Sequence, residues 1–227
     1  MNKKLKITSY ILGFLLILYV ILKYTGICAL YTISSTSSEP NLKHGSFILI
    51  SNLITPKRGD FTAFTFKNPE LGESTWMHRL CAMENDTVQI IDGTLFVNGE
   101  NFDEQYNLQH SYLLSEEKFN SLNDPTIENF PILNDENNKA YITFIEDVDA
   151  RTHKLAADRY RDLKTIPNPE INKTYQQDWN KDHFGPLVIP KGKVFLLGDN
   201  RDNSMDSRFI GLIDVSAIKG VRWKTLF

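Results

Sequence analysis

A stretch without charged residues near the start of the chain constrains the fold more than any other feature. Lys3, Lys4 and Lys6 precede it, and the 16 residues Ile7–Leu22 carry no charge. A membrane-spanning helix needs roughly 20 apolar residues. The long side chain of Lys23 can extend to the membrane interface, however, and the residues that follow to position 29 are mostly apolar. We therefore expect a transmembrane signal anchor over residues 7–29.

The three lysines also predict the orientation of the span, because lysines beside a span favour its cytoplasmic end. Residues 1–6 are expected to form a cytoplasmic N-terminus, with the rest of a single-pass protein on the extracytoplasmic side. A cleaved secretory signal has the same charged head and apolar run, but it ends at small residues in alternation. Residues 26–29 (GICA) are the nearest match and a poor one, so an uncleaved anchor is favoured.

Beyond the anchor, short runs of β-branched and aromatic residues alternate with turn residues, which is typical of strands. Asp92-Gly93 separates two such runs, 87–91 and 94–97, and is a strong two-residue hairpin signal. We expect a mostly β fold with an antiparallel β core formed by residues 30–100 and 184–227. The other expected strands cover residues 46–50, 61–66, 76–83, 187–190 and 194–197.

Residues 101–183 differ in composition from the segments that flank them. Asn, Asp and Glu are dense there and apolar periodicity is weak, apart from a helix-like pattern over Asp149–Leu163. No chemical motif stands out in this segment. We expect an inserted α/β or irregular subdomain between the two halves of one β core.

Charge and cysteine content exclude several classes of function. The net charge of −3, with both signs mixed, provides no basic surface for nucleic acid. Cys28 and Cys81 form no CxxC pattern, which excludes a disulfide framework and a thiolate zinc cluster. Two unpaired thiols are favoured, and a single bridge stays open. No metal or organic cofactor is implied, because no metal-ligand spacing joins the remaining histidines, His44, His110, His153 and His183.

Two polar segments can carry chemistry. Ser35–Leu42 (STSSEPNL) follows the anchor, and Pro40 restricts the backbone so that a nearby serine hydroxyl can be held exposed, although an ordinary serine-rich linker has the same composition. Gly198–Gly211 is dense in Gly, Asn and Asp directly after a strand, which indicates a loop. A calcium loop is the alternative, but the glutamate at its twelfth position is missing and Arg201 and Arg208 would repel a cation.

The loop segment Gly198–Arg208 (GDNRDNSMDSR) resembles the most diagnostic motif of the bacterial type I signal peptidases. Ser37-Ser-Glu-Pro is similar to the nucleophile motif of that family, usually Ser-Met-x-Pro. Arg58-Gly-Asp-Phe61 resembles its Gly-Asp strand motif, and Met77-His-Arg-Leu80 stands where the family has Lys-Arg, with Asp86 closing that motif. The resemblance covers residues 35–86 and 185–220 in order and leaves the insert outside.

The resemblance implies a role for each matching residue. Ser37 would be the nucleophile, and Ser35 would form the oxyanion hole together with the backbone N–H of Ser37; donors of this kind typically lower a barrier by ~3–4 kcal/mol. Ser204 corresponds to the serine that orients the general base. Ion pairs that hold the loop together are implied for Asp199, Asp206 and Arg208, with Arg79 joining them. For these charges simple loop stabilisation and a direct catalytic part are equal alternatives.

His78 departs from the bacterial pattern, which has a lysine as general base at this position. A lysine must be desolvated to lose its proton near neutral pH, whereas histidine titrates near 6.5 without such help. The endoplasmic reticulum branch of the family also has histidine here. Strand alternation places His78 on one face with Trp76 and Leu80, an apolar setting that lowers the pKa of the imidazole. An acidic partner would raise it, and Asp199 and Asp206 are the candidates.

The function implied is endoproteolysis of exported preproteins after small-x-small motifs, typically Ala-x-Ala, at the bacterial cytoplasmic (inner) membrane near the export machinery. The partners would be signal peptides and the lipid bilayer, and the substrate would add an extended strand to a sheet edge. Because Ser38 replaces the customary methionine and His78 the customary lysine, a catalytically impaired homologue that binds signal peptides stays open. A dedicated processing peptidase of a secretion system is the third hypothesis.

Overall fold

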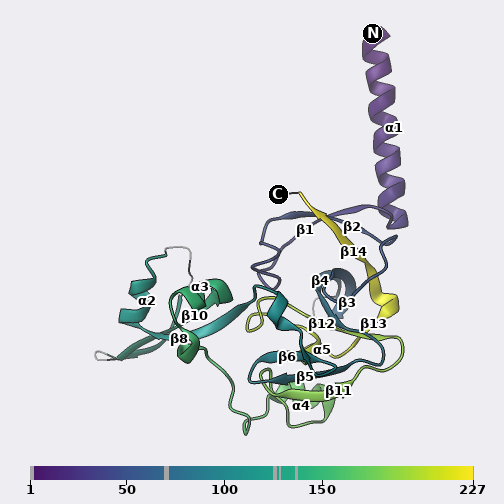
Figure 1. Ribbon diagram of the computed structural model, residues 1–227. Coiled ribbons are helices and arrows are strands. Elements are labelled where there is room, and N and C mark those ends of the chain that lie inside the picture. The colour runs from purple at the N-terminus through teal and green to yellow at the C-terminus, as the bar shows by residue number, and fades with distance from the viewer. Residues whose placement is uncertain (1–2, 69–71, 125–126, 128, 136–137, 227) are drawn as a thin grey trace.

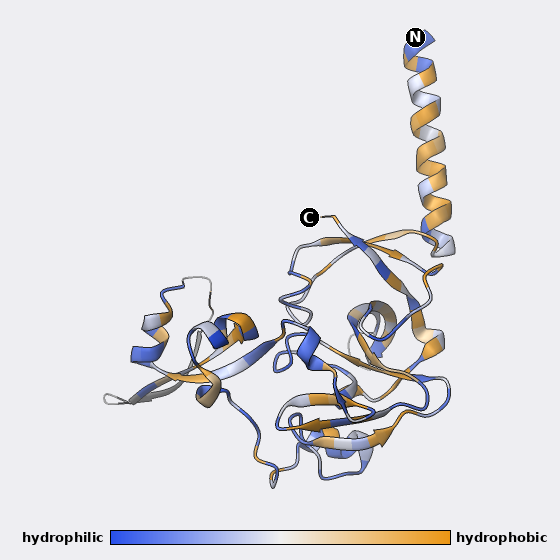
Figure 2. Ribbon diagram, in the orientation of Figure 1, coloured by the Kyte–Doolittle hydropathy of each residue, from blue (hydrophilic) through white to orange (hydrophobic). Residues whose placement is uncertain are grey.

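The N-terminal helix projects away from the rest of the molecule (Figure 1). The computed structural model describes residues 3–68, 72–124, 127, 129–135 and 138–226. Helix α1 (Lys3–Thr25) buries none of its residues and is long and apolar enough to cross a membrane, and hydrophobic residues predominate along its ribbon in Figure 2. The helix begins before the predicted residue 7 and ends before residue 29. Gly26 ends it in a left-handed conformation (φ 74°), which glycine adopts without steric cost.

Within the described residues, three antiparallel sheets follow α1, and the largest contains seven strands in the order β1-β2-β14-β3-β4-β12-β13. Strand β14, from the end of the chain, therefore lies between two early strands. The strands of this sheet are β1 (Ala29–Thr32), β2 (Phe47–Ser51), β3 (Phe61–Asn68), β4 (Gly72–Ala82), β12 (Lys193–Leu197), β13 (Ile213–Asp214) and β14 (Ile218–Thr225).

A four-stranded sheet in the order β11-β5-β6-β7 packs against the first. Its strands are β5 (Thr87–Ile91), β6 (Thr94–Val97), β7 (Glu100–Asn101) and β11 (Phe184–Val188). Asp92 (φ 50°) and Gly93 (φ 75°) form the turn between β5 and β6, so the hairpin prediction is confirmed. One apolar cluster joins the two sheets through buried residues such as Cys81, Leu95 and Phe195. The predicted mostly β, antiparallel fold class is confirmed.

Residues 109–152 form a separate lobe beside this core (Figure 1). A three-stranded sheet in the order β8-β10-β9 carries two short helices and has its own apolar cluster, which includes Leu114, Leu122 and Ile145. Its elements are β8 (Gln109–Ser115), α2 (Glu116–Leu122), β9 (Asn129–Asp135), β10 (Asn138–Glu146) and α3 (Asp147–Thr152). We call this lobe the inserted subdomain.

The helix predicted over Asp149–Leu163 is wrong in its extent. Only α3 and the short 3-10 helix η2 (Ala156–Asp158) are helical there. Lys154 takes a left-handed backbone conformation (φ 57°), and Arg159 then pairs with Tyr112 of β8 as an isolated bridge. Hydrogen bonding to a neighbouring strand thus replaces the continuation of the helix.

The last part of the predicted insert packs on the β core. Helix α4 (Pro169–Tyr175) buries Ile171 in the cluster between the two sheets, next to Phe184. Asn168 caps this helix by accepting hydrogen bonds from the backbone N–H groups of Glu170 and Ile171, as an N-cap asparagine does. The remaining short elements are η1 (Asp103–Gln105), α5 (Ser207–Ile210) and η3 (Val215–Ala217).

Candidate active site

Ser37 lies in the loop between β1 and β2 and is half-buried. Its Oγ is 3.0 Å from Ser35 Oγ. Its backbone carbonyl accepts a hydrogen bond from the N–H of Asn200 at 3.1 Å. A Cβ atom on Gly198 would meet Ser37 O at 2.4 Å and Ser204 Oγ at 2.2 Å, so no larger residue fits there. The loop that begins at Gly198 therefore packs directly against the Ser37 backbone.

Ser38 joins the same segment to β4. Its side chain is buried, and its Oγ donates a hydrogen bond to the carbonyl of Met77 at 2.8 Å. Met77 directly precedes His78, so this bond holds the backbone next to Ser37 against the backbone next to His78. A methionine at position 38 has no donor for this bond.

His78 points into an apolar setting on β4. Its side chain is 2% exposed, and its ring centroid lies 5.6 Å from that of Phe64 and 6.1 Å from that of Trp76. Leu80 belongs to the apolar cluster that contains Phe64 and borders Trp76, in agreement with the predicted strand face. Burial lowers the pKa of His78 to about 4, against the opposing effect of nearby carboxylates.

The imidazole has few polar partners. Nε2 lies 3.5 Å from Ser204 Oγ, at the long limit of a hydrogen bond. Nδ1 is buried and has no hydrogen-bond partner among the described residues. Among the described residues no hydrogen bond joins His78 to Ser37 Oγ, which bonds to Ser35 instead. A neutral imidazole with a free nitrogen is consistent with the lowered pKa.

Neither candidate carboxylate orients His78. Asp206 bonds to Arg208 through both oxygens and to the N–H of Gly198 at 3.2 Å. Asp199 accepts from Arg79 Nε at 2.7 Å and from Asn41 Nδ2 at 2.7 Å. Burial acts to raise the pKa of Asp206, but Arg208 outweighs it, so that pKa lies below its ordinary value. Both carboxylates raise the pKa of His78 only at a distance, without a hydrogen bond to the ring.

Ser37 and His78 line one pocket of about 400 Å³. Chain segments 32–38 and 75–78 form most of its wall, and Asn203 and Met205 complete it. Ser35 also lines the pocket, and Ser204 lies behind it against His78. The described residues contain no group of three His, Cys, Asp or Glu side chains that could hold a metal ion. Cys28 and Cys81 are both free thiols.

Comparison with known proteins places the chain in a family. Residues 6–224 match the model of the family described as signal peptidase, peptidase S26. This chain belongs to the S26 signal peptidase family. It is similar to the signal peptidase I of Aquifex aeolicus, with 31% identity over 91% of this chain and 78% of that protein. The signal peptidase I of Buchnera aphidicola is 28% identical over 88% of this chain and 70% of its own length.

A solved structure is also similar. The crystal structure of a signal peptidase I from Enterococcus faecalis has 22% sequence identity and a TM-score of 0.35, covering 74% of this chain and 97% of that chain.

The charged residues of the loop after β12 are buried in this S26 protein, and most find partners outside the loop. Only Asp206 and Arg208 pair with each other. Arg201 binds Asp103, and Asp202 binds Lys181, so pairing within the loop is a minor part of what holds it. Arg79 reaches Asp199 as the resemblance implies, and its Nη1 also donates to the carbonyl of Gly59 at 2.6 Å.

A second ion pair, between Arg58 and Asp86, links the Gly-Asp motif (Arg58–Phe61) to the motif that contains His78 and ends at Asp86. Arg58 Nε donates to Asp86 Oδ2 at 2.8 Å, and Asp86 also accepts from the N–H of Met83 at 2.8 Å, which closes the turn after β4. The Gly-Asp motif and the strand that carries His78 are therefore held together by the Arg58–Asp86 pair and by the bond from Arg79 to Gly59.

Proposed function

We propose that this chain is a membrane-anchored serine endopeptidase that removes signal peptides from exported preproteins after small-x-small sites. The observation that carries the proposal is that Ser37 and His78 line the same pocket in a member of the S26 signal peptidase family. Relatives from several bacteria bear the name signal peptidase I. Ser37 is the nucleophile in this proposal, and His78 is the general base.

The first chemical step is attack of Ser37 Oγ on the scissile carbonyl. The developing oxyanion takes hydrogen bonds from Ser35 Oγ and from the backbone N–H of Ser37. The 3.0 Å contact between the two hydroxyls puts Ser35 within reach of the oxyanion, which is carried by the carbon bonded to Ser37 Oγ. One donor of this kind is worth ~3–4 kcal/mol of barrier.

His78 accepts the Ser37 proton at Nε2 and passes it to the leaving amine. Its pKa of about 4 keeps the ring neutral at physiological pH, which is the form a base requires. Ser204 Oγ, 3.5 Å from the same Nε2, orients the ring before substrate binds and gives this contact up to Ser37 Oγ, because a neutral imidazole has one acceptor nitrogen. The Ser37–His78 hydrogen bond forms when substrate displaces water, because catalytic hydrogen bonds often tighten only in the substrate complex. Water then releases the acyl chain by the same steps in reverse.

The substrate lies extended between chain segments 32–36 and 75–78. Both segments line the pocket, and a strand bound beside them would gain main-chain hydrogen bonds from their edges. Side chains such as Ile33, Met77 and Trp76 leave limited room, which favours small residues before the scissile bond. In this proposal residues 30–100 and 184–227 are the catalytic core. Residues 101–183 are the insert, and the inserted subdomain is its part from residue 109 to residue 152.

The membrane is proposed as the second partner. α1 is the anchor, and exposed apolar side chains lie on the adjacent strands β1, β2 and β14, near the end of α1 (Figure 1). Trp223 is 64% exposed, and Leu30 and Phe47 are exposed as well. An apolar surface of this kind suits contact with lipid. We place the catalytic core on the extracytoplasmic face of a bacterial cytoplasmic membrane, near the export machinery.

A silent relative that binds signal peptides is the second candidate. The unpartnered Nδ1 of His78 and the absence of a bond to Ser37 among the described residues favour it. The discriminating experiment is cleavage of a precursor with an Ala-x-Ala site by wild type, Ser37→Ala, His78→Ala and His78→Lys between pH 5 and 9. Cleavage that both alanine variants abolish supports the enzyme. A precursor left intact by wild type overturns the proposal, and full activity of His78→Ala removes His78 as the base.

A further inference from the structure

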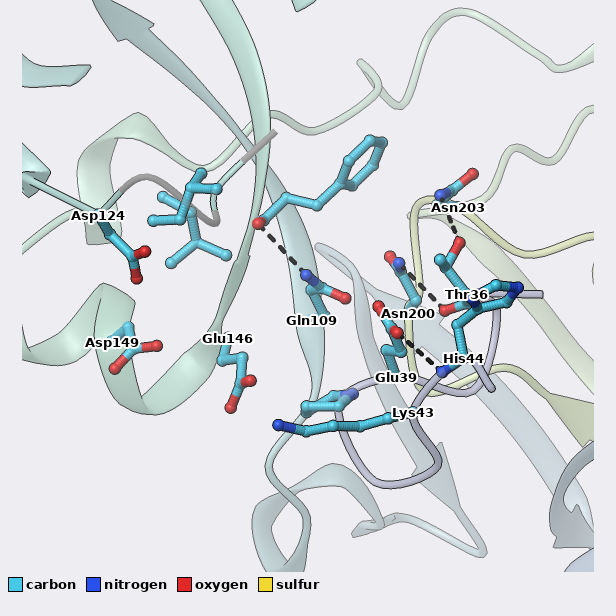
Figure 3. A pocket seen from close by; sticks show the side chains of 14 residues that line it. Thr36, Glu39, Lys43, His44, Gln109, Asp124, Glu146, Asp149, Asn200 and Asn203 are labelled. Atoms are coloured by element: carbon cyan, nitrogen blue, oxygen red, sulfur yellow. Dashed lines mark hydrogen bonds between the residues drawn. The ribbon is translucent and has the colours of Figure 1, made fainter. Parts of the chain in front are cut away.

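A second cleft lies between the Ser37 loop and the inserted subdomain (Figure 3). Its volume is about 430 Å³. Thr36 and Asn203 line both this cleft and the pocket of Ser37 and His78, so the two cavities meet beside the nucleophile.

Two of the side chains that line the cleft, those of Asn200 and Gln109, each hold a buried hydrogen-bond acceptor without a partner among the described residues. Asn200 is 2% exposed, and its Oδ1 has no partner. Gln109 Oε1 is likewise buried without a partner. The NH2 group of each amide is already held by a carbonyl, that of Phe144 at 3.3 Å for Gln109 and that of Thr36 at 3.4 Å for Asn200 (Figure 3). Flipping either amide would put oxygen against oxygen, so the free group is an acceptor in both cases.

Buried acceptors without a donor are costly, and a ligand with N–H groups removes that cost.

The charge around the cleft adds a second requirement. Carboxylates of Glu39, Asp124, Glu146 and Asp149 line it, together with the ammonium of Lys43. Glu146 comes from the end of β10 and Asp149 from α3, so the inserted subdomain supplies much of the negative charge. A ligand with N–H donors and a positive charge fits both features.

We propose that this cleft binds the first residues of the substrate after the scissile bond and prefers lysine or arginine there. The inference rests on the proposed function, in which the small residues before the scissile bond fill the Ser37 pocket. Backbone N–H groups of the released chain bond to Gln109 Oε1 and Asn200 Oδ1. A cationic side chain then lies near Glu146 and Asp149. The inserted subdomain, which carries no catalytic residue of the proposed mechanism, thereby acts as a specificity element.

The test compares three precursor peptides with one Ala-x-Ala site and either Ala, Lys or Glu at the second to fourth positions after it. The full-length protein in detergent is expected to cleave the Lys peptide with kcat/KM about tenfold above the Glu peptide at low ionic strength. The preference should fall below about twofold in the double variant E146Q/D149N, and in wild type at high salt. Glu117→Gln, which removes an exposed carboxylate of α2 outside the cleft, is the matched control and keeps the preference.

Gln109→Met separates the hydrogen bonds from the charge. Its expected effect is a rise in KM of about fivefold for all three peptides, with kcat and the Lys-to-Glu ratio kept, since one ordinary hydrogen bond is lost. Equal kcat/KM for the Lys and Glu peptides in wild type overturns the inference, as does a preference that survives in E146Q/D149N.

A binding measurement keeps the inference testable if the enzyme proves silent. Labelled peptides of the released side are titrated onto the Ser37→Ala protein by fluorescence anisotropy, and the Lys peptide should bind about tenfold tighter than the Glu peptide. If wild type cleaves no peptide but the binding difference is present, the proposed function is rejected and the proposed preference of the cleft for cationic residues is supported. If all peptides are cleaved at the same rate and bind equally, the proposed peptidase function is supported and the proposed role of the cleft is rejected.

Discussion

The burial of His78 makes a quantitative prediction about stability at acidic pH. The pKa of this imidazole falls from its ordinary value of 6.5 to about 4 in the folded chain, because burial disfavours the charged ring. The unfolded chain therefore takes up a proton near pH 6.5, while the folded chain does not do so until about pH 4. Protonation stabilises the unfolded state alone in this window, so His78 lowers the free energy of unfolding as pH falls through it.

The magnitude follows from the two pKa values. Linkage gives a loss of about 1.4 kcal/mol at pH 5.5 and about 2.5 kcal/mol at pH 4.5, relative to pH 7.5. Above about pH 7.5 the imidazole is almost entirely neutral in both states and contributes almost no pH dependence. Carboxylates with lowered pKa values, such as that of Asp206, add their own loss at lower pH, so His78 must be isolated by comparison with a variant.

The assay is urea unfolding of the full-length protein in detergent, followed by tryptophan fluorescence, for wild type and His78→Gln at pH 7.5, 5.5 and 4.5. Trp76 lies 6.1 Å from His78 between ring centroids and reports on this part of the core. The variant is less stable at pH 7.5 because it leaves space in the core, but its stability should fall less on acidification, by about 2.5 kcal/mol. Parallel pH dependence of the two proteins would refute the claim that burial keeps this imidazole neutral.

Two further predictions concern residues around the site. Arg79→Gln leaves the buried carboxylate of Asp199 without its ion pair. The variant should lose about 3–5 kcal/mol of unfolding free energy in the same assay. Lys139→Gln, which breaks an exposed ion pair, is the control and should leave the unfolding midpoint unchanged. His78→Lys should regain more cleavage activity when combined with Ser38→Met than alone, and equal activity of the single and double variants would show that positions 38 and 78 act independently.

The sequence predicts the β core because its signals are local. Asp92-Gly93 has the left-handed conformations that a two-residue hairpin requires, and the neighbouring β-branched runs are strands β5 and β6. The apolar setting of His78 also follows from alternation along one strand, since Trp76 contacts it from two residues away. These features depend on residues close together in the chain.

Features that depend on distant residues were not predictable in this way. The partners of Asp199 come from β4 and from Asn41, so no local pattern could show that this carboxylate is unavailable to His78. The packing of α4 on the core depends on Phe184 and its neighbours in the cluster. A local signal for the helix itself did exist: Asn168 followed by Pro169 is a favourable N-cap and first helical residue.

The second cleft shows why a motif-based view of the site is incomplete. Gln109 belongs to no motif, yet its backbone N–H donates to the carbonyl of Asp199 and its carbonyl accepts from Arg201. The inserted subdomain is therefore fastened to the loop after β12 at its first strand. This attachment puts the amide of Gln109 beside that of Asn200, and neither residue by its sequence context indicates a binding site.

The two departures from the family pattern, Ser38 and His78, are connected through one hydrogen bond. An imidazole reaches less far from its strand than a lysine side chain does, so a histidine base needs the nucleophile segment closer to β4. The bond from Ser38 Oγ to the carbonyl of Met77 holds that segment directly against the residue before His78. Methionine at position 38 cannot donate it. In the proposed mechanism the serine therefore compensates for the shorter reach of a histidine base at position 78, so the two departures support each other as parts of one active site.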